Sequence, residues 1–128
     1  VQNGDHVRWA APPRDSNATG SATAASLTIT TPAGIKTRAF GHLEARDTTG
    51  ASNTAYILIS DLAVADIDPG TLANMRTLST APVGNYSDSA NWFVFTNTSS
   101  QVRLRASNAF QTINVWTEGY IDRRGRDT

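Results

Sequence analysis

The side chains that could carry out chemistry are few in this sequence, and no familiar catalytic pattern arranges them. The chain has two histidines, His6 and His42, and contains neither Gly-x-Ser-x-Gly nor His-Glu-x-x-His. Asp68 could pair with Glu44 or with Glu118 as the two carboxylates of a glycosidase, but spacing along the chain gives that pair no geometry. The sequence therefore predicts no catalytic residues, and we expect a protein that is not an enzyme.

Metal binding has three weak candidates, which are Asp61, Asp66 and Asp68. Their carboxylates are close together in sequence, and oxygen ligands of this kind suit calcium. The alternative is a turn before Gly70 that Asp side chains cap without any ion. The chain has no cysteine, which excludes disulfides and cysteine-ligated metals. We therefore expect no metal and no cofactor.

Aromatic rings at otherwise polar strand positions are the stronger signal. Trp116 and Tyr120 are predicted to share the outward face of one strand, and Phe40 and His42 that of another, while residues 92 to 95 carry rings on both faces. Rings on a solvent face form patches that commonly serve as interfaces. Three interpretations stay open: contact between subunits, stacking against the sugars of a bacterial surface glycan, and cover by another part of the same chain.

Arginine is the second signal, because ten of the eleven basic residues are Arg. Residues 122 to 127 form a charged tail, which suits either ion pairs with a neighbouring subunit or plain solvation. The formal net charge is zero, so we expect no nucleic acid partner. The predicted interface or ligand-binding residues are Phe40, His42, Trp92, Arg103, Arg105, Trp116, Tyr120, Arg123, Arg124 and Arg126.

The elements that must position these residues are strands. No run of ten residues has helical apolar spacing with caps, whereas apolar and polar residues alternate in many short segments. In residues 35 to 46 the odd positions are small or apolar and the even positions are charged or aromatic. Residues 55 to 60 are apolar on both faces, which indicates a central strand. Residues 12 to 25 are polar with two prolines and are expected to form a long surface loop or an arm.

Further strands are expected at residues 5 to 9 and 27 to 31, and at 75 to 80 and 92 to 96, the last two separated by a loop over 81 to 89. The 128 residues fit one domain, spanning 1 to 128. We predict an all-β, antiparallel two-sheet sandwich of about eight strands, jelly-roll-like in arrangement.

The last third of the chain predicts a specific register. Apolar alternation in residues 101 to 106 and 112 to 117 suggests one hairpin, and the faces match if Leu104 lies opposite Ile113. This pairing requires a loop over Ser107 to Phe110. It also places Arg103 diagonal to Trp116, within reach of a cation–π contact.

Two stretches near the carboxyl end also carry a family resemblance. Residues 96 to 105 (TNTSSQVRLR) and 115 to 127 (VWTEGYIDRRGRD) resemble the end of small β-domains in tailed-bacteriophage virion proteins, which often close with glycine, an aromatic residue and Asp-Arg-Arg-Gly-Arg. Residues 32 to 36 and 58 to 69 resemble earlier parts of such domains, so the resemblance covers roughly residues 30 to 127. It implies a domain of tail fibres or other appendages, commonly trimeric.

The resulting functional expectation is a virion structural protein. The first hypothesis is an appendage domain, fibre or spike, that mediates assembly and attachment to the host surface. We expect the domain to function without a long fibre shaft before it, so a capsid decoration or cement protein is the alternative, and a glycan-binding module is a third. The expected partners are further copies of the chain as a homotrimer, other virion proteins and a host-surface glycan. No stretch approaches the roughly 18 apolar residues of a membrane span. The resemblance implies that the protein is made in the bacterial cytoplasm and is located in the virion.

Overall fold

A computed structural model describes residues 2–3, 5–20, 23–47, 56–67, 69, 77–79, 86–107 and 110–122, and within them every regular element is a β-strand. The ten strands are β1 (Gln2–Asn3), β2 (His6–Arg8), β3 (Arg14–Gly20), β4 (Ala25–Thr28), β5 (Arg38–Asp47), β6 (Tyr56–Ser60), β7 (Leu78–Ser79), β8 (Tyr86–Phe95), β9 (Gln101–Ala106) and β10 (Phe110–Ile121). The predicted all-β class is confirmed.

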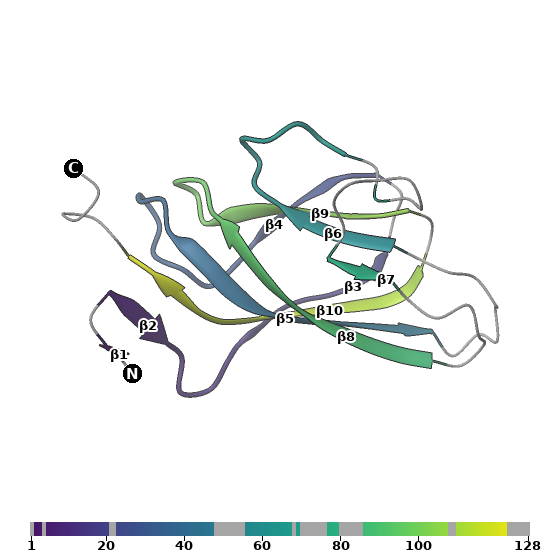
Figure 1. The fold of residues 1–128 in the computed structure, drawn as a ribbon, viewed down its shortest axis with the longest axis horizontal. Helices are drawn as coiled ribbons and strands as arrows, with labels where there is room; N and C mark the ends of the chain where they lie inside the picture. The colour runs from purple at the N-terminus through teal and green to yellow at the C-terminus, as the bar shows by residue number, and fades with distance from the viewer. Residues whose placement is uncertain are drawn as a thin grey trace.

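The strands form two antiparallel sheets, as predicted (Figure 1). A six-stranded sheet has the order β1-β2-β10-β5-β8, with β3 also paired to β10, and a four-stranded sheet has the order β4-β9-β6-β7. β2 and β3 lie end to end along one edge of β10. The two antiparallel sheets confirm the predicted sandwich, and the jelly-roll-like arrangement stays a prediction.

The core lies between the two sheets and contains the predicted apolar faces. Ala39, Leu43 and Ala45 of β5 are fully buried, whereas the intervening side chains point outward. In β6, the predicted central strand, residues 57 to 60 are all buried. Burial on both faces explains why that strand shows an unbroken apolar run instead of an alternating one.

Two predicted loops are strands. Residues 12 to 25 were expected to form a loop or an arm, but Arg14–Gly20 is β3 and pairs with β10 of the same chain. Residues 81 to 89 were expected to separate two strands, but β8 already begins at Tyr86 and pairs with β5 along its whole length. β3 and the first part of β8, residues 86 to 91, have few apolar side chains, so apolar alternation does not reveal their backbone pairing in the sequence.

The predicted hairpin of residues 101 to 117 is wrong. β9 pairs with β4 and β6 in the four-stranded sheet, whereas β10 belongs to the other sheet. Leu104 therefore lies opposite Ala25 and Ile59, and not opposite Ile113. Alternation shows which face of a strand is buried, and two strands that face each other across a core have the same alternation as two strands of a hairpin. Phe110, expected in the loop, is the first residue of β10.

Candidate functional site

The candidate site is on the outer face of the six-stranded sheet, where side chains of β2, β5, β8 and β10 come together. Cross-strand pairing sets the neighbours: Phe40 lies opposite Phe93, and Arg38 opposite Phe95. On the other side of β5, His42 lies opposite Trp116. Paired residues of an antiparallel sheet project to the same face, so these rings and the guanidinium form one surface.

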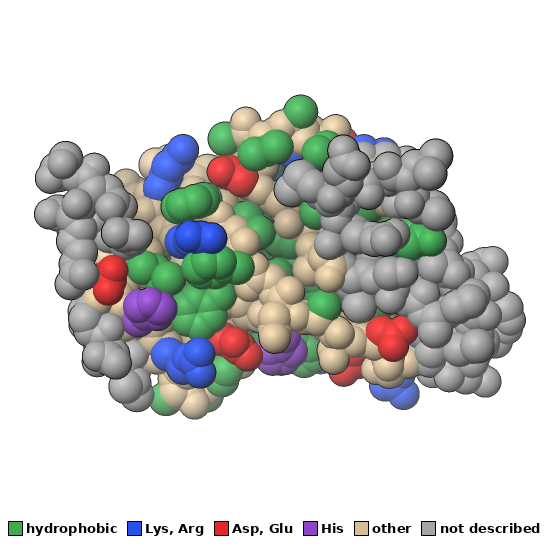
Figure 2. All heavy atoms as spheres, in the orientation of Figure 1, with side chains coloured by type: hydrophobic (Ala, Val, Ile, Leu, Met, Phe, Trp, Pro, Cys, Tyr) green, Lys and Arg blue, Asp and Glu red, His purple; other side chains and the backbone are tan. Residues whose placement is uncertain are grey.

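The two phenylalanines of β8 are the most exposed part of this surface. Phe93 is 45% exposed and Phe95 is 52% exposed. The guanidinium carbon of Arg38 lies 3.7 Å from the ring centroid of Phe93 and 5.4 Å from that of Phe95, within the range of a cation–π contact. In Figure 2, hydrophobic side chains lie beside basic side chains and a histidine on the left part of the visible face.

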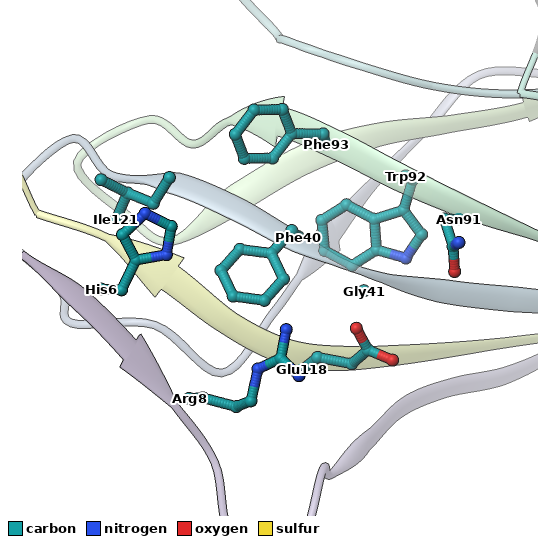
Figure 3. A pocket seen from close by; sticks show the side chains of 9 residues that line it. All are labelled: His6, Arg8, Phe40, Gly41, Asn91, Trp92, Phe93, Glu118 and Ile121. Carbon is teal, nitrogen blue, oxygen red and sulfur yellow. The ribbon is translucent and has the colours of Figure 1, made fainter. Parts of the chain in front are cut away.

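A shallow depression of about 470 Å³ adjoins these rings. Its lining comes from β2, β5, β8 and β10 (Figure 3) and consists of His6, Arg8, Phe40, Gly41, Asn91, Trp92, Phe93, Glu118 and Ile121. The volume falls within the roughly 300 to 1,000 Å³ of typical small-molecule sites, and the combination of apolar rings with a few polar groups is also typical of them.

Phe40 lies at the centre of this depression because Gly119 makes room for it. The glycine is opposite Phe40 in the β5–β10 pair, and a Cβ on it would come within 2.9 Å of Cζ of Phe40 and would also collide with the carbonyl oxygen of Val7. With no side chain at this position, the ring of Phe40 reaches towards β2. There it lies 6.3 Å from the ring of His6 and 5.5 Å from the guanidinium carbon of Arg8.

His42 has two partners on the same face. Its ring stacks on Trp116, with 4.7 Å between the ring centroids and 13° between the ring planes. Its Nδ1 lies 3.2 Å from Oε1 of Glu118, whose side chain is 31% exposed. The predicted cation–π contact of Trp116 with Arg103 is therefore replaced by a stack with His42.

A bulge in β10 corrects the prediction for Tyr120. The register with β5 shifts between Thr117 and Gly119, so Glu118 is an extra residue and the alternation of faces reverses beyond it. Trp116 faces outward, as expected, but Tyr120 lies opposite buried Ala39 and packs 6.0 Å from the ring of Trp9. Ile121 takes the outward position instead.

Three other predicted interface residues have contacts inside the chain. Trp92 is 4% exposed and belongs to the core, although it reaches the floor of the depression. Arg103 donates to the carbonyl oxygen of Val64 over 2.7 Å, and Arg105 donates to Asp66 over 2.8 Å. Their side chains are 14% and 21% exposed, so these arginines hold the loop after β6 against β9.

The metal candidates have other roles where they are described. Asp66 is paired with Arg105, and Asp61 caps a turn by accepting a hydrogen bond from the backbone of Ala63 over 2.9 Å. In the described part of the chain, no three His, Asp or Glu side chains are grouped to hold an ion. Asp68 and the arginines of the tail, Arg123, Arg124 and Arg126, lie outside the described residues.

The predicted site residues did not include His6, Arg8, Arg38, Asn91, Phe93, Phe95 or Ile121. The signal for Phe93 was present, because Phe93 and Phe95 alternate with buried or half-buried neighbours and so share an exposed face. His6 and Arg8 lie in the short β2, Arg38 and Asn91 are polar residues of longer strands, and Ile121 is the last residue of β10. Only the order of strands in the sheet brings these residues beside Phe40.

No protein-family model matches the chain, and no curated protein matches it. Among the described residues, no helix is long and apolar enough to cross a membrane.

Proposed function

We propose that this domain is an attachment domain of a tailed-bacteriophage virion, part of a fibre or spike, and that it contacts the host surface through the outer face of its six-stranded sheet. The observation that carries the proposal is the pair Phe93 and Phe95, which are about half exposed and lie under the guanidinium of Arg38 beside the depression.

The composition of this face supports a binding role. Aromatic residues and arginine are enriched at protein interfaces and at their energetic centres. Large apolar side chains are normally buried, so two neighbouring phenylalanines left exposed on one strand indicate a contact with something outside the chain. The depression next to them provides a concave surface for this contact.

The resemblance of residues 96 to 105 and 115 to 127 to virion β-domains supplies the biological setting. An appendage presents several copies of its domain at once. Weak individual sites then act together, because each binding event raises the effective concentration of the next.

The second candidate, a capsid decoration protein, is less well supported. An arm formed by residues 12 to 25 would have favoured it, because an arm can bind a neighbouring subunit. In the structure, Arg14–Gly20 pairs with β10 of its own chain, and Asp15 accepts hydrogen bonds from Thr30 and Thr117. The segment is thus engaged within the domain.

Adsorption to bacteria tests the proposal. Fluorescent beads carrying many copies of the chain are mixed with a panel of bacterial strains, and bound beads are counted by flow cytometry. We expect adsorption to some strains, and we expect the double variant Phe93→Ala/Phe95→Ala to lose it. Val64→Ala is the matched control, because Val64 is also 45% exposed but lies in the loop after β6.

If the double variant still adsorbs to bacteria, this face is not the attachment surface. Binding to purified phage heads, with none to cells, would establish the decoration role instead. Light scattering of the purified chain measures its assembly state, and a trimer agrees with an appendage.

A further inference from the structure

We propose that two copies of this chain pair through β8, one strand antiparallel to the other, and form a symmetric dimer with one continuous sheet. The two-fold axis of this dimer passes through Asn91. The inference goes beyond the attachment role and does not depend on it, because it concerns how copies of the domain associate with each other.

β8 is the outermost strand on one side of the six-stranded sheet (Figure 1). It pairs with β5 over all 10 of its residues. β6 and β7 of the other sheet also come near β8, but they pair with each other and with β9 instead. Within the part of the chain that the structure describes, the outer edge of β8 therefore has no neighbouring strand.

The hydrogen-bond pattern shows which residues of β8 direct their backbone groups to this outer edge. The N–H of Thr96 donates to the carbonyl oxygen of Thr37 over 2.8 Å, in the register that continues the pair of Arg38 and Phe95. Bonded and non-bonded pairs alternate along an antiparallel ladder, so every second residue of β8 turns its N–H and C=O away from β5. Among the described residues, these outward backbone groups have no partner, and they belong to Ser87, Ser89, Asn91, Phe93 and Phe95.

This edge lacks the features that keep the sheet edges of soluble domains apart. Such edges commonly carry lysine or proline, contain a bulge or consist of a short strand. Residues 86 to 95 (YSDSANWFVF) contain no Lys, Arg, Pro or Gly, and their register with β5 has no shift. A long, regular edge strand with little charge is a template to which another strand can add.

The sequence of β8 fits a second copy of itself. An axis at Asn91 gives every outward-directed residue from 87 to 95 a partner and places each large side chain opposite a small one. The pairs between the two copies are Phe93 with Ser89, Phe95 with Ser87 and Trp92 with Ala90. The two Asn91 amides meet at the axis, where each can donate one hydrogen bond and accept another. An unrelated strand would not have this match of sizes.

The charges also permit the pairing. Asp88 is the only charged residue of β8 and would lie opposite Val94 of the second copy, so the two Asp88 carboxylates do not meet. The axis is perpendicular to the sheet, and both outer faces therefore point to the same side. Each copy has one β8, so the assembly closes at two copies, whereas the resemblance implies a trimer.

Cysteine cross-linking tests the pairing and its register. The chain contains no cysteine, so Asn91→Cys introduces a single thiol at an exposed position. Directly paired residues have Cα atoms about 5.5 Å apart, which a disulfide can span. We expect Asn91→Cys to form a covalent dimer under mild oxidation. Ser87→Cys is the control, because its two copies lie at opposite ends of the paired strands, and it should stay monomeric on a denaturing gel.

Sedimentation over a series of concentrations measures the association of the unaltered chain, and we expect an equilibrium of monomer and dimer. Ser89→Pro should weaken the dimer by more than about tenfold, because each copy loses an outward N–H. That N–H is not used in pairing with β5, so the variant should keep its fold, which circular dichroism checks. Ser89→Ala retains the N–H and should keep the dissociation constant within about threefold.

The outcomes keep this proposal separate from the attachment role. A monomer at every concentration, or a trimer that Ser89→Pro leaves intact, would overturn the dimer. Equal cross-linking of Asn91→Cys and Ser87→Cys would overturn the axis at Asn91. A dimer whose beads adsorb to no bacterium would support this pairing and contradict the attachment role alone. Adsorption by a chain that stays monomeric would support attachment and overturn the pairing.

Discussion

Trp92 packs over Gly41 across the β5–β8 pair, closely enough to exclude any side chain at the glycine. A Cβ on Gly41 would lie 2.8 Å from Cζ2 of Trp92 and would collide with the carbonyl oxygen of Trp116 in β10. The glycine therefore holds three strands of the six-stranded sheet at their observed spacing, directly beneath the depression.

Gly41→Ala should destabilise the domain strongly, because the colliding atom on β10 belongs to the backbone and cannot swing aside. We expect a loss of about 3 kcal/mol or more in the free energy of unfolding, measured by urea denaturation. Gly34→Ala is the control: Gly34 has φ of 85° with open space around it, so only the left-handed backbone costs energy, about 1 kcal/mol. Equal losses in the two variants would contradict the packing argument.

Trp92→Phe should be tolerated although Trp92 is 4% exposed. Its buried Nε1 has no hydrogen-bond partner among the described residues, so phenylalanine removes a donor that is already unsatisfied. We expect thermal or urea unfolding to show a loss below about 1.5 kcal/mol, against about 3 to 5 kcal/mol for Trp92→Ala. A large loss in the phenylalanine variant would mean that the indole N–H is bonded.

Asp15→Ala should cost about 2 kcal/mol, because the carboxylate is the common acceptor of three donors. It accepts from the backbone N and the hydroxyl of Thr30, over 2.8 and 2.5 Å, and from the hydroxyl of Thr117, which is fully buried. Without Asp15 this buried hydroxyl loses its acceptor. Asp66→Ala, which removes a more exposed carboxylate paired with arginine, should cost less than about 1 kcal/mol.

A double-mutant cycle on His42 and Glu118 should give a small coupling energy. The two side chains are 36% and 31% exposed, so water screens the interaction across their 3.2 Å contact. We expect less than about 1 kcal/mol from unfolding measurements on His42→Ala, Glu118→Ala and the double variant. A coupling of several kcal/mol would show that this pair is an essential part of the sheet.

Local alternation predicted individual strands well. It placed the buried face of β5 correctly at Ala39, Leu43 and Ala45, and it identified β6 as central, because side-chain burial follows directly from a period of two. The outward orientation of Trp116, which is half-buried, followed from the same rule.

The arrangement of strands could not be predicted in this way. The apolar faces of β9 and β10 both meet the core, but from opposite sheets, and one-dimensional alternation is identical in the two cases. The bulge at Glu118 was not predicted, so Tyr120 was assigned to the wrong face. Gly119 was the available signal, because a glycine inside a strand pattern often marks a bulge. The polar β3 is held by Asp15, which looks like a loop residue in sequence.

The position of β10 has a consequence for synthesis. This strand pairs with β5 on one side and with β2 and β3 on the other. Without it, β5 and β8 would not be joined to β2 and β3 in one sheet. On the ribosome, the nascent chain must therefore keep β2, β3 and β5 from pairing wrongly until residues 110 to 121 have emerged. Exposed strand edges invite aggregation during such a delay. Chains cut before residue 110 should accordingly accumulate in inclusion bodies or be degraded.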